Sequence, residues 1–258
     1  MTTTGLYDIV RRWRKCNLEA PPYLFPDDSL SALQSLATGH RSFKAYISSP
    51  EFGSGHEHAL HIGLLPMPYA GNLAMASVFI LMLNPGLSPG DYYAEHQPEF
   101  RRAHIRTLRQ ENAGDPFPFV FLDPRFSWHP GFGYWHNKFR AVIAALSGKR
   151  GVTYQQAMST LARELACLEL LPYHSKSFGA GTLLSRLPSA VAMRAFVHDA
   201  LLPKVKEGDA LIIATRSAAT WDLPHHKRIV VYDAGEARSA HLTPASRGGR
   251  AIMQHLGL

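Results

Sequence analysis

Cysteine is nearly absent from this chain. Its 258 residues include only Cys16 and Cys167. Two cysteines cannot form a disulfide framework, and they are too few for a four-cysteine zinc or iron–sulfur site. Isolated thiols are typical of a reducing compartment, so we expect a cytoplasmic protein.

Long apolar runs are missing as well. No window approaches the roughly 18 consecutive apolar residues that a membrane helix needs. The first five residues, Met-Thr-Thr-Thr-Gly, lack the apolar core of a secretion signal. We therefore expect a protein that neither crosses nor associates with a membrane.

Acidic residues are scarce relative to basic ones. The chain has 20 Asp and Glu against 27 Lys and Arg, which gives a formal net charge of +7 and a sequence pI of about 9.5. This balance favours an anionic partner, with DNA as the leading candidate, although a basic enzyme without such a partner is the alternative. We expect no cofactor and no obligate protein partner.

Apolar residues make up 46% of the chain, enough for a large core. The longest informative run is Val-Phe-Ile-Leu-Met-Leu at residues 78–83, which has no polar face and predicts a central parallel strand covered on both sides. Asn84, Pro85 and Gly86 follow it directly. Ligands of open α/β sheets bind outside the carboxyl ends of strands, so chemistry is expected first at Asn84.

The periodicity along the chain predicts an α/β protein. We expect a single three-layer domain at residues 76–258, with a mostly parallel central sheet flanked by helices, and an N-terminal extension at residues 1–75 packed on it. Asp28 is expected to cap the second helix. The expected strands are 43–47, 59–65, 78–83, 117–122, 165–171, 210–214 and 229–232, and the expected helices are 6–16, 29–37, 98–111, 135–146, 154–164, 190–206 and 250–255.

Two motifs give the chain a family resemblance. The segment Leu-Asn-Pro-Gly-Leu-Ser at residues 83–88 resembles the first motif of the uracil-DNA glycosylase superfamily, especially its mismatch-specific uracil/thymine branch. The segment His-Pro-Gly-Phe-Gly-Tyr-Trp at residues 129–135 is similar to that branch's His-Pro-x-x-x-aromatic-Trp segment. The resemblance covers roughly residues 76–250, with an insertion at residues 92–120, and also extends to a divergent bacterial group of glycosylase-like proteins.

The resemblance assigns a catalytic role to Asn84. Cleavage of an N-glycosidic bond builds oxocarbenium character on the sugar and negative charge on the departing base. A carboxamide is too weak to act as a strong general base, but it can position a water by hydrogen bonding. Most of the barrier must then fall through electrostatic stabilisation of the base. The family's Asn holds the attacking water, and we expect Asn84 to do so here.

Gly86 bears on the substrate. In the strict uracil enzymes the matching residue is a Tyr that blocks substituents on C5 of the base, so the resemblance implies a pocket open to thymine or to another 5-substituted pyrimidine. A simple turn requirement would also place glycine at this position.

The remaining pocket residues follow from the same resemblance. Pro85 and Gly86 are expected to face the base, and Phe126 or Trp128 to stack on it once it leaves the helix. His129 is expected to be structural or to lie at the pocket edge, and Trp135 to belong to the core. Where the family reads the base edge with an Asn, this chain has Tyr173, His174 and Ser175, which either replace that reading or merely cap the next segment.

The C-terminal loop at residues 240–247 stands where the family's second catalytic motif falls. It is degenerate here, and we expect His241 to take the catalytic place. Residues 247–250 are expected to form a wedge loop that enters the duplex. The expected phosphate contacts are Ser88, Lys176, Arg216, Ser246, Arg247 and Arg250.

The hypothesis is a monofunctional DNA glycosylase without a metal, acting in repair or in defence against phages with modified bases. A non-catalytic DNA-binding protein of the same fold is the first alternative. The second is a metal-dependent hydrolase or nuclease built on Asp123, His129 and His136, three residues whose number and spacing make a weak metal cluster.

Overall fold

The computed structural model describes residues 3–33, 36–215, 218–233, 235–236 and 242–258. Among these residues every helix is too short or too polar to cross a lipid bilayer. The chain forms two compact units, each assembled from three segments. Unit 1 comprises Met1–Tyr69, Leu83–Arg109 and Glu169–Ala200, and unit 2 comprises Ala70–Met82, Gln110–Leu168 and Leu201–Leu258.

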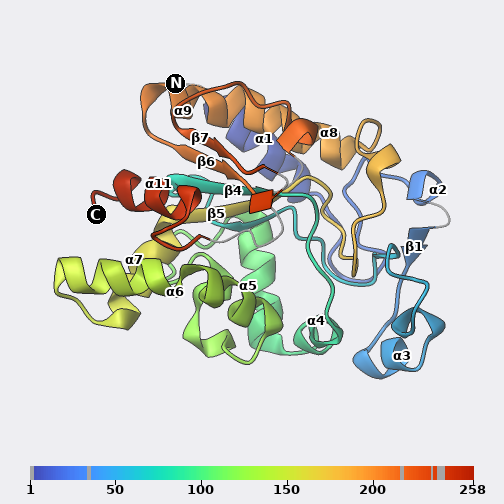
Figure 1. The fold of residues 1–258 in the computed structure, drawn as a ribbon. Coiled ribbons are helices and arrows are strands. Elements are labelled where there is room, and N and C mark those ends of the chain that lie inside the picture. Colours follow the sequence, from blue (N-terminus) through green and yellow to red (C-terminus); the bar gives the residue numbers. More distant parts are fainter. Residues whose placement is uncertain (1–2, 34–35, 216–217, 234, 237–241) are drawn as a thin grey trace. The chain divides into compact units, whose positions relative to one another are not determined.

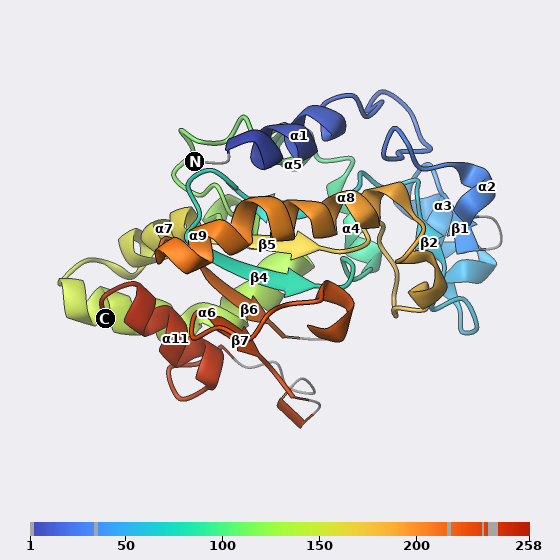
Figure 2. The ribbon, with the colours of Figure 1, turned by 90° about the horizontal axis from the view of Figure 1, so that it is seen from above.

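A five-stranded sheet forms the centre of unit 2, apart from two end residues that belong to unit 1. Its strand order is β3-β5-β4-β6-β7, and Figure 2 shows β5, β4, β6 and β7 lying side by side. The pairs β4–β6 and β6–β7 are parallel. The strands are β3 (Tyr69–Gly71), β4 (Val78–Met82), β5 (Leu165–Glu169), β6 (Leu211–Ala214) and β7 (Ile229–Val231).

The buried central strand predicted from the apolar run is confirmed as β4. Val78 to Leu81 are at most 1% exposed, and Val78 pairs with Leu211 of β6 in parallel register. A strand covered on both faces needs apolar residues on both, which is why the run shows no alternation.

The order of the strands reverses at β4. The chain runs from β4 to β5 on one side and later returns to β6 and β7 on the other side. Ligands of open α/β sheets bind outside the carboxyl ends of the strands at such a switch point. There Thr215, directly after β6, donates from Oγ1 to Sδ of Met82 at 3.0 Å. Asn84 follows β4 by two residues in the chain.

Helices of unit 2 pack against one another and against the sheet. The long helix α6 packs on α7 and on the 3-10 turn η3, and α11 packs beside β6 and β7 (Figure 1). The helical elements of this unit are η3 (Val120–Leu122), η4 (Pro124–Phe126), α6 (Pro130–Arg150), α7 (Tyr154–Glu164), α9 (Leu202–Glu207), η7 (Ala218–Trp221) and α11 (Arg247–His255).

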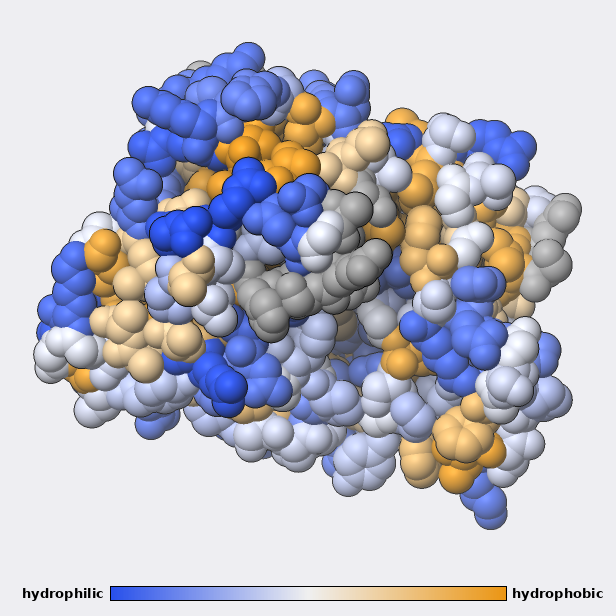
Figure 3. Space-filling model, viewed as in Figure 1, coloured by the Kyte–Doolittle hydropathy of each residue, from blue (hydrophilic) through white to orange (hydrophobic). Residues whose placement is uncertain are grey.

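Unit 1 is mainly helical, and α1 packs there against α5 and α8. A small parallel pair, β1 (Ala37–Thr38) and β2 (Leu60–His61), joins Thr38 to His61. Figure 3 shows hydrophobic side chains on the surface at α3, where Phe43 and Ile47 are each 38% exposed. The helical elements are α1 (Thr3–Trp13), α2 (Leu30–Leu33), α3 (Phe43–Ile47), η2 (Pro50–Phe52), α4 (Pro89–Ala94), α5 (Pro98–Arg109), η5 (Gly181–Leu183), α8 (Pro188–Phe196) and the π-helical turn η6 (Val197–Leu201) that leads into α9.

Three predicted elements were wrong, and the strand expected at 59–65 is reduced to the two residues of β2. Residues 43–47 form the helix α3 because Ser42 caps it, accepting a hydrogen bond from the Ala45 amide at 3.1 Å. The apolar run 117–122 contains the 3-10 turn η3 in place of a strand. The helix expected at 29–37 is reduced to α2, and Asp28 bonds to Tyr173 and Ser189 instead of capping it.

The α/β class is confirmed, with its strands and helices alternating along much of the chain. Buried apolar side chains occur in both units, and the largest include Trp13 and Phe25 in unit 1 and Trp221 in unit 2. The predicted boundary at residue 75 stays a prediction.

Candidate active site

Two segments of unit 1 run side by side just past the ends of β4 and β5. The Leu171 amide donates to the Leu83 carbonyl at 2.8 Å, and the Ser175 amide donates to the Pro85 carbonyl at 3.2 Å. Gly86 and Ser175 then form a parallel bridge. The pairing brings the Asn84 loop next to the residues 173–175 that sequence reasoning selected independently.

Asn84 is clamped through its amide nitrogen. Nδ2 lies 2.8 Å from Ser175 Oγ, 3.1 Å from the Pro85 carbonyl oxygen and 3.2 Å from the Tyr173 carbonyl oxygen. Carbonyl oxygens only accept hydrogen bonds, so these contacts identify the NH₂ side of the carboxamide. Within the described residues no group donates to Oδ1, which leaves that oxygen as an acceptor on a partly exposed side chain.

Ser175 fixes the clamp from the opposite segment. Its hydroxyl donates to the Ser177 carbonyl at 2.9 Å, so the oxygen presents lone pairs to Asn84. Ser175 is only 2% exposed, and its rotamer is held by both bonds. The pair Asn84–Ser175 is therefore pre-organised in the absence of any ligand.

His174 holds the backbone at Gly86. Its Nδ1 lies 2.9 Å from the Gly86 carbonyl oxygen, and because a carbonyl only accepts, Nδ1 carries the hydrogen. Burial lowers the pKa of His174 from 6.5 to about 4. The imidazole is therefore neutral at pH 7, and it acts as a donor to the loop and not as a charge.

Tyr173 takes part through its backbone. Its side chain is 1% exposed, and its hydroxyl donates to Asp28 at 2.6 Å and accepts from the Phe25 amide at 3.1 Å. Burial raises the pKa of Tyr173 well above its usual value, and the Asp28 carboxylate acts in the same direction. Tyr173 therefore presents its carbonyl oxygen to Asn84, while its ring and hydroxyl anchor the N-terminal segment.

Nothing in the backbone demands glycine at position 86. Gly86 is exposed and does not lie in the left-handed region, and a Cβ built on it meets no atom within 4 Å. The turn requirement that would explain this glycine is absent. A Cβ at position 86, where the strict uracil enzymes have a tyrosine, would therefore meet no neighbouring atom.

Two predicted phosphate contacts in unit 1 already have protein partners. The Ser88 hydroxyl caps α4 by accepting from the Gly90 amide at 3.1 Å, and the Ser88 amide donates to Asp91 at 2.6 Å. Lys176 donates from Nζ to the carbonyls of three consecutive residues, Glu51, Phe52 and Gly53, at 2.8 to 3.0 Å. An ammonium group has three hydrogens, so these bonds use all of them.

A cluster of buried rings lies behind this loop. The His61 amide donates to the His174 carbonyl at 2.8 Å, and His61 Nδ1 contacts the Tyr92 hydroxyl at 2.9 Å. Burial lowers the pKa of His61 from 6.5 to about 3. In the described part of the chain, His61 Nε2 and the hydroxyl of the adjacent Tyr46 have no hydrogen-bond partner.

In unit 2, only one of the two stacking candidates offers an exposed ring. Phe126 is 1% exposed and belongs to the core, whereas Trp128 is 45% exposed and meets Phe126 edge to face. His129 caps α6 by accepting from the Gly131 amide at 2.9 Å. Trp135 is buried against Phe119, as predicted.

The predicted wedge loop at residues 247–250 is wrong, because these residues form the first turn of α11. Ser246 caps the helix and accepts from the Gly249 amide at 3.0 Å. A Cβ on Gly249 would lie 1.7 Å from the Thr243 carbonyl oxygen, so the turn packs too closely on the backbone to serve as a mobile wedge. Arg247 pairs with Glu236 at 2.8 Å, and Arg250 bonds to the Ala245 carbonyl.

His241 and Arg216 lie outside the described residues. The three residues of the metal hypothesis do not converge. Asp123 pairs with Arg125 at 2.6 Å, His129 caps α6, and His136 bonds to Tyr154 at 2.8 Å. No group of three or more His, Cys, Asp or Glu side chains is placed to hold a metal ion in the described parts of the chain.

Sequence reasoning missed the supports of the loop. Asp28 bonds to Tyr173 and the His61 amide to His174, each from more than a hundred residues away in sequence, and no local signal marks these contacts. The capping box of α4 did have a signal, since Ser88 precedes a proline and stands three residues before Asp91.

Comparison of the chain with protein-family models, with curated proteins and with solved structures finds no match.

Proposed function

We propose that this protein is a DNA glycosylase that hydrolyses the N-glycosidic bond of a flipped, modified or mismatched pyrimidine and leaves an abasic site. The proposal includes a three-layer fold of the uracil-DNA glycosylase type around the β4 switch point. The observation that carries it is the clamped carboxamide of Asn84, whose free Oδ1 follows the strand at that switch point.

The geometry suits a residue that positions water. With its NH₂ held by Ser175 and two carbonyls, the Asn84 carboxamide cannot rotate freely, so Oδ1 offers one fixed acceptor direction. A water that donates to this oxygen is held with a lone pair free to attack C1′ of the sugar. Because the water is already held in place, the entropy cost of bringing it to the sugar is reduced. The charge on the leaving base must be stabilised by another group. We propose His241, the residue expected in the place of the family's second catalytic motif, for that second task.

The space at Gly86 supports a 5-substituted base as the substrate. Neither the backbone conformation nor the packing requires glycine at this position. The space that a side chain would fill can therefore admit a substituent on C5 of the base. Of the two stacking candidates, both in unit 2, Trp128 stays the candidate because its side chain is exposed and that of Phe126 is buried. The net charge of +7 is in keeping with a DNA backbone as the partner.

The decisive test of the enzyme uses three proteins and a set of oligonucleotides. Wild type, Asn84→Ala and the control Asn137→Ala, an exposed position on α6, are incubated with DNA bearing uracil, a thymine mismatch or a 5-substituted cytosine, and abasic sites are then cleaved with alkali. We expect Asn84→Ala to lose at least about a hundredfold in kcat with DNA affinity retained. Wild-type protein that binds DNA but releases no base would instead identify a non-catalytic binding protein.

The clamp and the pocket have their own tests. Ser175→Ala frees one side of the Asn84 carboxamide and is expected to lower kcat about tenfold with little change in KM. Gly86→Tyr is expected to abolish excision of 5-substituted bases and to spare uracil, whereas Gly86→Ala is expected to spare both. If Gly86→Tyr affected both substrates equally, the specificity assigned to this position would be refuted.

A further inference from the structure

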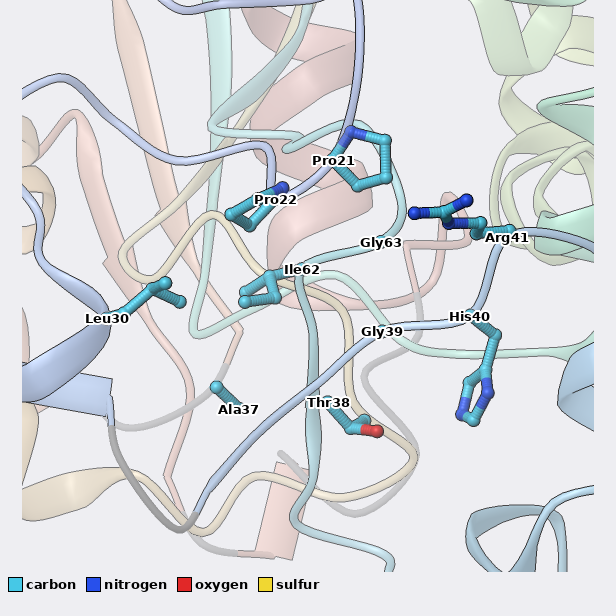
Figure 4. A pocket seen from close by; sticks show the side chains of 10 residues that line it. All are labelled: Pro21, Pro22, Leu30, Ala37, Thr38, Gly39, His40, Arg41, Ile62 and Gly63. Atoms are coloured by element: carbon cyan, nitrogen blue, oxygen red, sulfur yellow. The ribbon is translucent and has the colours of Figure 1, made fainter.

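A pocket of about 430 Å³ lies in unit 1, and none of the residues that line it belongs to the Asn84 loop or to residues 173–175 (Figure 4). Its volume falls in the range of small-molecule sites, roughly 300–1,000 Å³. It is formed between the Pro21–Pro22 segment and the β1–β2 pair. The lining residues are Pro21, Pro22, Leu30, Ala37, Thr38, Gly39, His40, Arg41, Ile62 and Gly63.

One wall of the pocket is apolar. Figure 4 shows Pro22, Leu30 and Ile62 around the same space, and Leu30 is 51% exposed on the short helix α2. Proline rings and aliphatic side chains present flat or smooth apolar surface without polar atoms. Such a wall fits the face of a planar ring or a sugar better than a chain of polar groups.

Arg41 supplies charge at the other wall. Its side chain extends toward Pro21 in Figure 4, and it is exposed. Throughout the described residues, no carboxylate or carbonyl accepts a hydrogen bond from its guanidinium group. Nε2 of His96 lies 3.0 Å from the Arg41 carbonyl oxygen, which ties the backbone down at the position from which the side chain projects.

Two glycines complete the polar wall. A Cβ on Gly63 would lie 2.8 Å from both N and O of His40, and one on Gly39 would lie 3.2 Å from N of Gly63. The two backbones therefore approach closely only because both residues are glycine. Within the described chain neither of the two glycine amides donates a hydrogen bond. Free backbone N–H groups beside an arginine form an anion-binding surface.

We propose that this pocket binds a nucleoside 5′-monophosphate group. The phosphate contacts Arg41 and the amides of Gly39 and Gly63, and the sugar and base lie against Pro22, Leu30 and Ile62. A free nucleotide and a nucleotide within a DNA strand share this chemistry. The proposal does not depend on the glycosylase activity, because the residues that line this pocket are not those of the candidate active site.

The test measures calorimetric binding of thymidine 5′-monophosphate, thymidine and inorganic phosphate to the full chain. Arg41→Gln is expected to weaken the monophosphate about tenfold and to leave thymidine unchanged. Leu30→Trp narrows the pocket on its apolar side and is expected to weaken the binding of both the monophosphate and thymidine. Arg102→Gln, an exposed arginine on α5, is the matched control and is expected to change neither.

Competition then identifies the source of the nucleotide. If thymidine 5′-monophosphate displaces a fluorescent thymidine decamer and Arg41→Gln weakens the decamer, the pocket receives a nucleotide of a strand. If the monophosphate binds in an Arg41-dependent way without displacing the decamer, the ligand is a free nucleotide. The proposal is overturned if the monophosphate does not bind, or binds no more tightly than thymidine, or binds Arg41→Gln as tightly as wild type. These measurements do not use base release. If the protein releases no base, the nucleotide-binding result can therefore still be interpreted.

Discussion

Asp91 makes the loop after β4 sensitive to pH. Its carboxylate accepts from the Ser88 amide at 2.6 Å in the capping box of α4. Desolvation raises the pKa of Asp91 from 3.8 to about 7, with the charge of Glu95 adding to the shift. The folded state therefore binds more protons than the unfolded state between these values, and the contribution of Asp91 to stability falls as the pH rises through 7.

The size of the effect follows from the shift. At pH 5 the folded-state pKa of about 7 lies two units above the pH, and at about 1.36 kcal/mol per unit this gives about 2.7 kcal/mol that is lost by pH 8. Asp91 is partly exposed, so solvent screening reduces the expected change to about 2 kcal/mol. Asp91→Asn keeps an acceptor for the Ser88 amide but cannot ionise.

Urea unfolding followed by the fluorescence of the four tryptophans measures this difference. Because the lowered pKa values of His61 and His174 give the opposite slope below about pH 6.5, the quantity of interest is the free energy of unfolding of Asp91→Asn minus that of wild type. We expect it to rise by about 2 kcal/mol from pH 5 to pH 8. The exposed Asp209→Asn is the matched control. A flat difference for Asp91→Asn would refute the reasoning.

Four further substitutions are tested for their effect on stability, and one of them also for its effect on DNA binding. Tyr46→Phe removes a buried hydroxyl that has no partner in the described residues, so Tm is expected to stay the same or to rise by about 2 °C; a clear fall would show that the hydroxyl is bonded. Lys176→Met is expected to lower Tm by about 5 °C, since three carbonyls lose their donor, and to leave the salt dependence of DNA binding unchanged; a shallower salt slope would reveal a phosphate contact instead. Gly71→Ala places a Cβ 2.3 Å from the Leu165 carbonyl oxygen at φ +94°, and is expected to cost at least about 3 kcal/mol, while Gly86→Ala is expected to change stability by less than about 0.5 kcal/mol. Equal effects of the two glycine changes would contradict the account of both.

The sheet was the part of the fold most visible in the sequence. The apolar runs that contain β4, β5, β6 and β7 all predicted strands. In β4, β5 and β6 nearly every side chain is buried, because strands covered on both faces have no polar alternation, whereas β7 has an exposed residue at Val231. Helix α7 was predicted with its bounds, since its apolar spacing is regular and Thr153 caps it. In these places the local pattern and the tertiary environment agree.

The errors arose where apolar content alone decided the prediction. Residues 43–47 are as apolar as a short strand, but the Ser42 cap and the burial of Tyr46 select a helix. Phe119 to Leu122 are all buried, and an apolar run of this length does not distinguish a strand from a buried turn. The adjacent Ser42 cap helps to decide the first case, and burial decides the second.

The sequence predicted which two segments meet at the candidate site, but not which of their atoms make the contacts. The expectation that Asn84 meets residues 173–175 followed from strand ends sharing one edge, and unit 1 brings these residues together. The sequence could not show which atoms make the contacts. Tyr173 contributes its backbone carbonyl oxygen, and the ammonium group of Lys176 donates to three backbone carbonyls. Residue type predicts chemistry, but the hydrogen-bond partners decide which atom remains free.

The interleaving of the two units has a consequence during synthesis. The last segment of unit 1 ends at Ala200, and the last segment of unit 2 is Leu201–Leu258. On the ribosome, residues 1–69 therefore leave the exit tunnel without the segments 83–109 and 169–200 that they pack against. The apolar surface of this nascent segment stays uncovered for as long as about 130 further residues take to be made, some 7 to 26 seconds at typical rates. We expect a chaperone to bind the nascent chain during that interval.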